Sequence, residues 1–156
     1  MITTLWLNGE FVTKDKPLIH HDDSGFLRAN GVFDSMLAVN GMPVNAQEHY
    51  LRLMHDCEVV LRYAPDLSFD QFYETAQNLL RENGIDTDHY ARIRTQVTGG
   101  ILKEFLGKPD NPTISMSCSR TRTPDNQEHI IEIVGLSGLP KNSFKIPPVT
   151  CVRMRA

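Results

Sequence analysis

Residues 32–41 read VFDSMLAVNG and predict a β-strand that ends in a tight turn. The first eight of these positions are rich in residues that favour strands. Asn40-Gly41 supplies two residues that tolerate positive φ, as a type I′ hairpin turn requires, and residues 42–44 begin the return strand. The same pattern occurs earlier, where Asn8-Gly9 separates short strands predicted over residues 4–7 and 11–13. The chain therefore opens with two predicted β-hairpins.

Two amphipathic helices are predicted after the second hairpin. Asn45 with Glu48, and Ser68 with Gln71, have the spacing of a helix N-cap and its third helical residue. Pro65 ends the first helix, and Asn83-Gly84 ends the second. Apolar residues recur at helical spacing and are expected to face the core: Tyr50, Leu53, Met54, Cys57, Val60 and Leu61, then Phe69, Phe72, Tyr73, Ala76, Leu79 and Leu80.

Beyond the helices the period of the sequence changes to two. Residues 91–98 alternate, with Arg92, Arg94 and Gln96 on the face opposite the apolar residues. Further strands are predicted over residues 113–119, 130–136 and 149–154. The strands and the two amphipathic helices together indicate an α/β domain.

Composition excludes several classes of protein. The chain has 156 residues, of which 40% are hydrophobic and 22% charged, so a disordered tail, a collagen-like repeat and a disulfide-stapled miniprotein are excluded. A pI near 6.0 gives no general attraction to nucleic acid, and no apolar run approaches the roughly 20 residues of a membrane span. Three cysteines without CxxC spacing are typical of reduced thiols, so we expect a cytoplasmic protein without nucleic-acid or membrane partners.

Self-contained catalytic motifs are absent from the sequence. It contains no GxSxG, P-loop, HExxH or GxGxxG pattern. His20-His21-Asp22-Asp23 suggests a metal site, but adjacent residues on an extended chain point to opposite sides. We therefore predict a solvated loop there and no metal site.

Three arginines are candidates for anion binding. Arg52 lies close to the apolar face of the first predicted helix, where it either pairs with Glu48 or Asp56 on the surface or meets an anion. Arg92 and Arg94 share one strand face, which is either solvated or paired with acids, or forms a wall that binds carboxylates. The residue types alone leave both alternatives open.

Four motifs in sequence order carry a resemblance to a known family. Residues 6–12 read WLNGEFV, residues 23–34 DSGFLRANGVFD, and residues 48–53 EHYLRL. Residues 90–94 read YARIR, and 97–100 follow as VTGG. Together they resemble the N-terminal half of the class IV pyridoxal-phosphate enzymes, which comprise branched-chain aminotransferases, D-amino acid aminotransferases and aminodeoxychorismate lyases.

The resemblance implies a fold, a cofactor and a site. The implied fold is α+β: residues 1–138 would form the small N-terminal domain of a fold type IV enzyme, a mostly antiparallel sheet with two helices packed on it. Residues 139–156 would form a linker and the first strand of a truncated large domain. The implied cofactor is pyridoxal 5′-phosphate, whose phosphate Arg52 would bind. The Schiff-base lysine is expected beyond Ala156, so no catalytic residue is assigned within this chain. A homodimer is implied, and the residues expected to line the substrate are Phe33, Tyr90, Arg92 and Arg94.

Departures from the family pattern bear on the substrate. Ser24 replaces the usual Arg, and Asp34 replaces the usual Glu. Residues 101–105 do not reproduce the Arg and His that bind the substrate carboxylate in D-amino acid aminotransferases. Tyr90-x-Arg92 looks more like the branched-chain enzymes. The resemblance thus implies transamination between an amino acid and a 2-oxo acid, branched-chain-like more than D-amino acid-like; the alternatives are aminodeoxychorismate lyase chemistry and a non-catalytic truncated domain.

Overall fold

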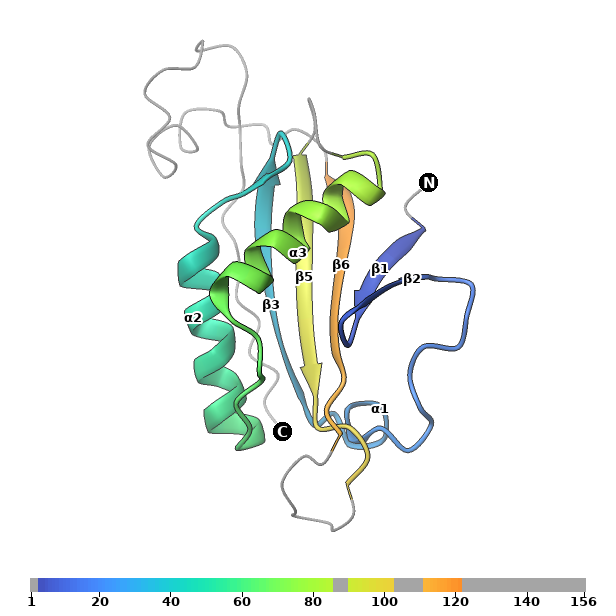
Figure 1. Cartoon of the computed structure of the whole chain (residues 1–156). Coiled ribbons are helices and arrows are strands. Elements are labelled where there is room, and N and C mark those ends of the chain that lie inside the picture. Colours follow the sequence, from blue (N-terminus) through green and yellow to red (C-terminus); the bar gives the residue numbers. More distant parts are fainter. Residues whose placement is uncertain (1–2, 86–89, 103–110, 122–156) are drawn as a thin grey trace. The chain divides into compact units, whose positions relative to one another are not determined.

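A six-stranded sheet organises the described part of the chain. The computed structural model describes residues 3–85, 90–102 and 111–121. The strand order is β2-β1-β6-β5-β3-β4 (Figure 1). The strands are β1 (Thr4–Leu7), β2 (Glu10–Thr13), β3 (Gly31–Val39), β4 (Met42–Pro43), β5 (Tyr90–Thr98) and β6 (Ile114–Thr121). Both predicted hairpins are confirmed, and the turn residues Asn8, Gly9, Asn40 and Gly41 all have positive φ.

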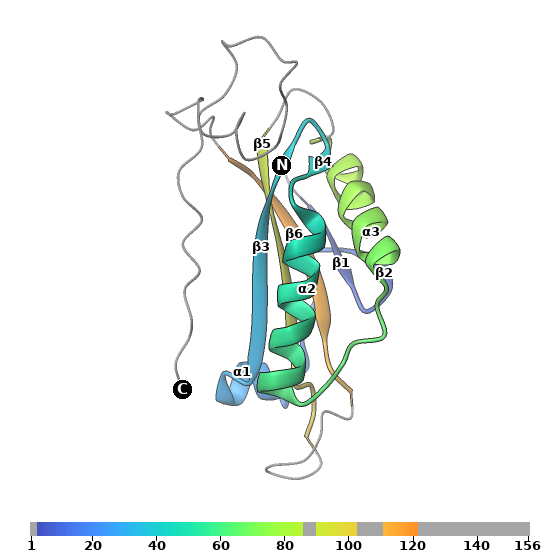
Figure 2. The ribbon, with the colours of Figure 1, turned by 90° about the vertical axis from the view of Figure 1, so that its left-hand side faces the viewer.

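Two long helices lie on the same face of this sheet (Figure 2). They are α2 (Ala46–Asp56), which continues as the π-helical turn η1 (Cys57–Leu61), and α3 (Phe69–Glu82). The predicted capping box of α3 is present, because Gln71 N donates to Ser68 Oγ at 3.2 Å and Ser68 N donates to Gln71 Oε1 at 2.9 Å. Asn45 precedes α2 as predicted but makes no side-chain cap, since its φ of 50° is outside the extended region that an N-cap bond needs.

The π-helical turn corrects one core prediction. Val60 was expected to face the core, but it is 57% exposed, as is its neighbour Val59 at 64%. A π-turn takes more residues per turn than an α-helix and so rotates the later side chains around the axis. As a result Cys57 and Leu61 are buried while Val60 faces outward.

The core fills the space between the helices and the sheet. β3 contributes alternate residues to it, and Trp6 and Met116 extend it across β1 and β6. The main buried residues are Trp6, Val32, Met36, Leu53, Cys57, Leu61, Phe72, Leu79, Leu80, Ile85, Ile93, Val97 and Met116. Neither α2 nor α3 covers the opposite face of the sheet (Figure 2).

A short helix that the sequence did not predict closes one end of the sheet. α1 (Ser24–Arg28) begins at Asp23, whose Oδ1 accepts from Gly25 N at 2.7 Å. The Oδ2 atom of Asp23 accepts from the hydroxyls of Thr98 and Thr113, each at 2.8 Å. A buried carboxylate with three donors therefore ties the segment before β3 to the end of β5 and the start of β6.

The chain divides into two compact units, residues 1–120 and 121–156. The predicted strands 130–136 and 149–154, and the predicted boundary between residues 138 and 139, lie outside the described residues. Among the described residues, no helix is both long and apolar enough to cross a bilayer.

Candidate functional site

An acidic residue occupies a core-facing position of β3. Side chains alternate along the strand, so Asp34 points to the helix-covered side together with Val32 and Met36. A carboxylate buried among apolar neighbours is costly unless it is paired and hydrogen-bonded. Helix α2 supplies two partners, His49 and Arg52, which lie on one helix face because they are three residues apart.

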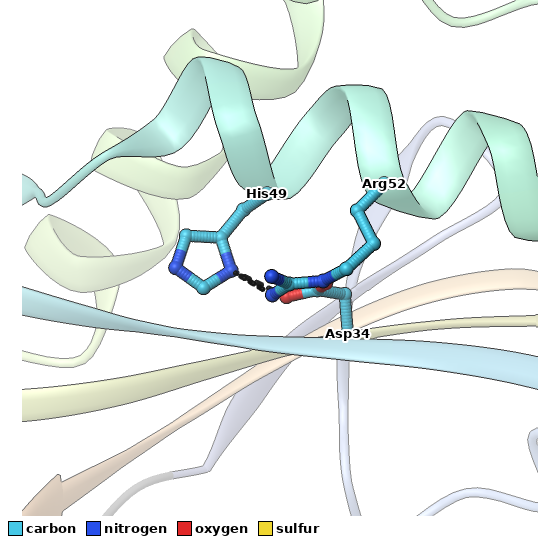
Figure 3. Close-up of polar contacts among 3 residues, drawn as sticks. All are labelled: Asp34, His49 and Arg52. Carbon is cyan, nitrogen blue, oxygen red and sulfur yellow. Dashed lines mark hydrogen bonds and ion pairs between the residues drawn. The ribbon is translucent and has the colours of Figure 1, made fainter. Parts of the chain in front are cut away.

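The three side chains form a closed unit (Figure 3). His49 Nδ1 lies 2.6 Å from Asp34 Oδ1, and Arg52 Nε donates to Asp34 Oδ2 at 2.6 Å. Arg52 Nη2 lies 2.8 Å from His49 Nδ1. The exposed fraction of the side chain rises from 6% for Asp34 and 13% for His49 to 42% for Arg52. The carboxylate is thus the buried end of the unit and the guanidinium its accessible end.

The two partners keep Asp34 ionised. Burial alone would raise the pKa of this carboxyl, but hydrogen bonds from His49 and Arg52 and their nearby charges lower the pKa below the ordinary value of 3.8. An ionised carboxylate accepts hydrogen bonds only, so both of its oxygens need donors. At neutral pH Asp34 is therefore a fixed negative charge that holds the Arg52 guanidinium.

The contacts of His49 bear on its tautomer. Nδ1 is within hydrogen-bond distance of both Asp34 and Arg52, yet one nitrogen cannot donate to the first and accept from the second at once. The ionised carboxylate of Asp34 requires a donor. A hydrogen bond from His49 to Asp34 therefore needs the proton on Nδ1, and a hydrogen bond from Arg52 Nη2 to His49 needs Nδ1 unprotonated.

This unit lies beside a part of β3 that has no second strand neighbour among the described residues, here called the open edge of β3. β4 pairs only with the end of β3, at Ala38 and Val39, and a further backbone bond joins Val44 to Leu37. Over residues 31–36, β3 has a strand neighbour among the described residues only on the β5 side. Helix α2 runs alongside this part of β3 (Figures 1 and 2). Arg52 is consequently accessible at the sheet margin rather than sealed beneath it.

The predicted substrate residues lie on the other face of the sheet. The register pairs Phe33 with Gln96, Ser35 with Arg94, and Leu37 with Arg92, so all six side chains share the face that α2 and α3 do not cover. The guanidinium carbon of Arg94 lies 3.9 Å from the ring centroid of Phe33. Arg92 is exposed and Arg94 is half-buried.

Tyr90 lies at the far end of this face. It pairs with Val39, six residues along β5 from the partner of Phe33, which corresponds to roughly 20 Å along the strand. Burial raises the pKa of Tyr90 to about 12, so its hydroxyl remains protonated at neutral pH. The structure brings Phe33 and Arg94 into contact and places Arg92 next to Arg94. Tyr90 follows Arg92 on the same strand face and is the farthest of the four from Phe33.

Sequence reasoning found Arg52 but missed the two residues that contact it, Asp34 and His49. Arg52 was expected to pair with Glu48 or Asp56 or to meet an anion, but its ion pair in the structure is with Asp34, eighteen residues away. Two signals were present in the sequence: an acid at a core-facing strand position, and a His three residues before an Arg on a helix. Only the packing of α2 on β3 joins them.

Other reactive groups do not gather into a second centre in the described part of the chain. No group of three or more His, Cys, Asp or Glu side chains there could hold a metal ion. In the segment considered for metal binding, His20 and His21 are exposed whereas Asp23 is buried against Thr98 and Thr113. Burial, with the negative charges of Asp56 and Glu58, raises the pKa of Cys57 to about 12.

Comparisons with known proteins agree with this architecture. The family model described as amino-transferase class IV matches residues 31–148. The D-alanine aminotransferase of Staphylococcus epidermidis is 26% identical over 133 residues, which cover 84% of this chain and 45% of that protein. The branched-chain amino acid aminotransferase of Escherichia coli has a similar structure, with a TM-score of 0.66 and 21% identity over 81% of this chain and 43% of that one. A hypothetical aminotransferase from Mycobacterium tuberculosis in its PLP-bound form has a TM-score of 0.61 and 20% identity over 74% of this chain and 39% of that one.

These likenesses differ in what they establish. The chain spans less than half the length of the Staphylococcus epidermidis relative and of these two solved structures. The solved structures share the fold, which confirms the predicted α+β architecture of a fold type IV enzyme. The family model covers most of the chain, and enzymes of this family depend on pyridoxal 5′-phosphate. As its sequence motifs predict, the chain belongs to the class IV aminotransferase family.

Proposed function

We propose that this chain forms part of a pyridoxal-phosphate-dependent enzyme that transfers an amino group between an amino acid and a 2-oxo acid. The observation that carries the proposal is the Arg52 guanidinium, fixed by Asp34 beside the open edge of β3. Membership of the class IV family supports it. Residues outside this chain are proposed to supply the lysine that carries the cofactor, and the enzyme is proposed to be a homodimer.

The residues at the β3 edge fit the phosphate of the cofactor. A guanidinium offers planar pairs of N–H donors that match two oxygens of a phosphate. Asp34 binds Nε of Arg52 and so orients the plane, while 42% of the side chain remains exposed to a ligand. A carboxylate–guanidinium unit of this kind binds an anion with less loss of side-chain entropy than a mobile surface arginine.

Phe33 and Asp34 point to opposite sides of one strand, which supports a site with two parts. As neighbours on β3 they point to opposite faces, Asp34 toward Arg52 and Phe33 toward Arg94. A ligand that lies along the open edge of β3 is therefore within reach of both. We propose that the phosphate binds on the Arg52 side and the amino acid on the Phe33 side.

Each group then has a defined task. The cofactor, when bound, acts as the electron sink for bond cleavage at the α-carbon of the amino acid. Arg52 binds its phosphate, and Asp34 maintains the charge and direction of Arg52. On the sheet face that α2 and α3 do not cover, here called the open face, Phe33 packs against the apolar part of the substrate. Arg92 binds a carboxylate on the same face. Tyr90 is proposed to donate a hydrogen bond from the same side.

We propose a substrate preference closer to branched-chain amino acids than to D-amino acids. The support is Tyr90-x-Arg92 on β5 and the absence from residues 101–105 of the Arg and His typical of D-amino acid enzymes. An amino-donor panel containing L-leucine, L-valine and D-alanine, with 2-oxoglutarate as acceptor, tests the preference. Faster turnover of D-alanine than of either L-amino acid would overturn it.

The cofactor assignment is tested by binding. In the enzyme that contains this chain, Arg52→Ala should weaken pyridoxal phosphate binding by at least tenfold, measured by absorbance titration, because it removes charge-assisted hydrogen bonds. Arg81→Ala is the matched control, since Arg81 is an exposed residue of α3 whose guanidinium bonds Asn78. Equal cofactor affinity in Arg52→Ala and wild type would refute the phosphate-binding role.

A further inference from the structure

A cavity separate from the Asp34 unit lies beside the start of α3. Its volume is about 520 Å³, which is in the range of small-molecule sites. Four segments contribute to its lining: the turn between β1 and β2, residues 63–67 after η1, the first turns of α3, and residues 111–114 at the start of β6. None of Asp34, His49 and Arg52 lines it, so this cavity and the proposed phosphate site can be tested independently.

The lining combines aromatic rings with one negative charge. Trp6 is buried and Tyr63 is half-buried. Of the described residues that line the cavity, Asp66 alone is charged, and its carboxylate forms no ion pair within the described part of the chain. Burial raises the pKa of Tyr63 and the negative charge of Asp66 adds to the rise, so the carboxylate lies near the phenol. Aromatic faces and a carboxylate both attract cations.

Hydrogen bonds hold the walls of the cavity in place. Asn8 N donates to Ile114 O at 2.9 Å, and Ile114 N donates to Asn8 Oδ1 at 2.7 Å. The Tyr50 hydroxyl of α2 donates to Leu67 O at 2.8 Å, which fixes the segment before α3. Gln71 Oε1 accepts from the backbone N–H of the α3 N-cap at 2.9 Å. A ligand that enters a site with ordered walls loses less free energy to ordering the protein.

Two side-chain amides add neutral hydrogen-bond donors. The bonds to the walls use Oδ1 of Asn8 and Oε1 of Gln71. They leave the NH2 group of each amide as a donor for an oxygen atom of a ligand. Because Asp66 would repel a carboxylate, a neutral oxygen such as a hydroxyl suits these donors better.

We propose that this cavity binds a small organic cation, an ammonium compound that also carries a neutral oxygen. Asp66 supplies the opposite charge, and Trp6 and Tyr63 supply the aromatic surface. The amides of Asn8 and Gln71 donate to the oxygen. The inference goes beyond the proposed transamination, because it assigns a second ligand site that needs neither the cofactor nor the substrate.

Choline is a suitable probe, because it combines a quaternary ammonium with a hydroxyl. It cannot condense with the aldehyde of pyridoxal phosphate, so its binding does not report on the cofactor site. Its uncharged carbon analogue, 3,3-dimethylbutan-1-ol, has nearly the same shape. In calorimetry on the enzyme that contains this chain, we expect choline to bind at least tenfold more tightly than the alcohol. Choline affinity should also fall at least twofold when NaCl is raised from about 50 mM to about 500 mM.

Four variants test the roles of the charge and the ring. Asp66→Asn should weaken choline binding at least threefold and change alcohol binding less than twofold, because it removes charge but keeps shape. Asp70→Asn is the matched control: it makes the same substitution at an exposed residue of α3 that does not line the cavity, and should leave choline affinity unchanged. Tyr63→Leu should weaken choline binding at least threefold, whereas Tyr63→Phe keeps the ring and should stay within twofold of wild type.

Several results would overturn the proposal. They are the absence of choline binding up to about 10 mM, equal affinity for choline and the alcohol, and equal losses in Asp66→Asn and Asp70→Asn. Arg52→Ala, which tests the cofactor site, should leave choline affinity unchanged. Weakened cofactor binding and intact choline binding in that variant would uphold both sites, and either site can fail without the other.

Discussion

Replacing Asp34 by Asn probes the unit that fixes Arg52. The substitution keeps the size of the side chain but removes its charge and one of its two acceptor oxygens. In the structure those oxygens bind His49 and Arg52, each at 2.6 Å. Asn can accept from one of them, so about one charge-assisted hydrogen bond is lost.

The stability that Asp34→Asn loses depends on how deeply Asp34 and Arg52 are buried. A hydrogen bond to a charged group contributes about 1.5–3 kcal/mol, and breaking a fully buried ion pair costs about 3–5 kcal/mol. Arg52 is 42% exposed and regains part of its hydration, which places the loss toward the lower range. We expect Asp34→Asn to lower the free energy of unfolding by about 2 kcal/mol and Tm by roughly 6–10 °C.

The effect should also depend on pH. The pKa of Asp34 is lowered in the folded protein, so its contribution to stability is complete above the ordinary value of 3.8 and is lost as the pH falls through the lower folded-state pKa. The difference in stability between wild type and Asp34→Asn should therefore be constant near neutral pH and shrink below 3.8. Thermal unfolding followed by circular dichroism from pH 3 to 7 measures it.

A matched control separates this unit from a general charge effect. Asp22 has a side chain that is 60% exposed, so Asp22→Asn should lower Tm far less than Asp34→Asn does. If Asp34→Asn were no more destabilising than Asp22→Asn, the buried carboxylate would not be what holds Arg52 in place.

Three other predictions concern the scaffold. Asn83→Ala should destabilise the protein by about 2–3 kcal/mol in urea unfolding, because the Asn83 amide bonds the backbone of Thr3, Thr4 and Leu79; an effect below about 1 kcal/mol would contradict this. Gly100→Ala should lower the free energy of unfolding by about 2–4 kcal/mol or abolish folding, since φ is 58° and an added Cβ would overlap the backbone of Asn111. An added Cβ at Gly84 meets no neighbour, so Gly84→Ala should lower the free energy of unfolding less in the same urea assay. In a Cys151→Ser background, Cys57 and Cys118 should resist a thiol reagent at pH 8 until the protein unfolds, because burial raises their pKa values to about 12 and about 11; rapid labelling of the native protein would refute it.

Local signals predicted most of the secondary structure. Asn8-Gly9 and Asn40-Gly41 determine their turns by backbone conformation alone, and the Ser68–Gln71 capping box acts within one helical turn. Alternation along β5 was enough to place Arg92 and Arg94 on the same face. These features depend on residues close together in sequence, so no knowledge of the packing was needed.

The features that were missed depend on tertiary packing. The exposure of Val60 follows from the π-turn η1, which a fixed period of 3.6 residues cannot indicate. Helix α1 is only five residues long, and Asp23 stabilises it through Thr98 and Thr113 from distant strands. Asp34 meets Arg52 only because α2 packs on β3 with one particular rotation.

The alternation of one strand joins the Asp34–Arg52 ion pair to the contact between Phe33 and Arg94. Asp34 secures Arg52 on the helix side, and its neighbour Phe33 carries Arg94 on the open side. A strand has a side-chain period of two, so a one-residue shift of β3 would point each of these side chains to the wrong face. In the proposed enzyme the nine-residue register between β3 and β5 would therefore be a functional constraint as well as a structural one. Adjacent positions of β3 face opposite sides of the sheet, so a neighbouring residue cannot make the contacts of Asp34 or of Phe33.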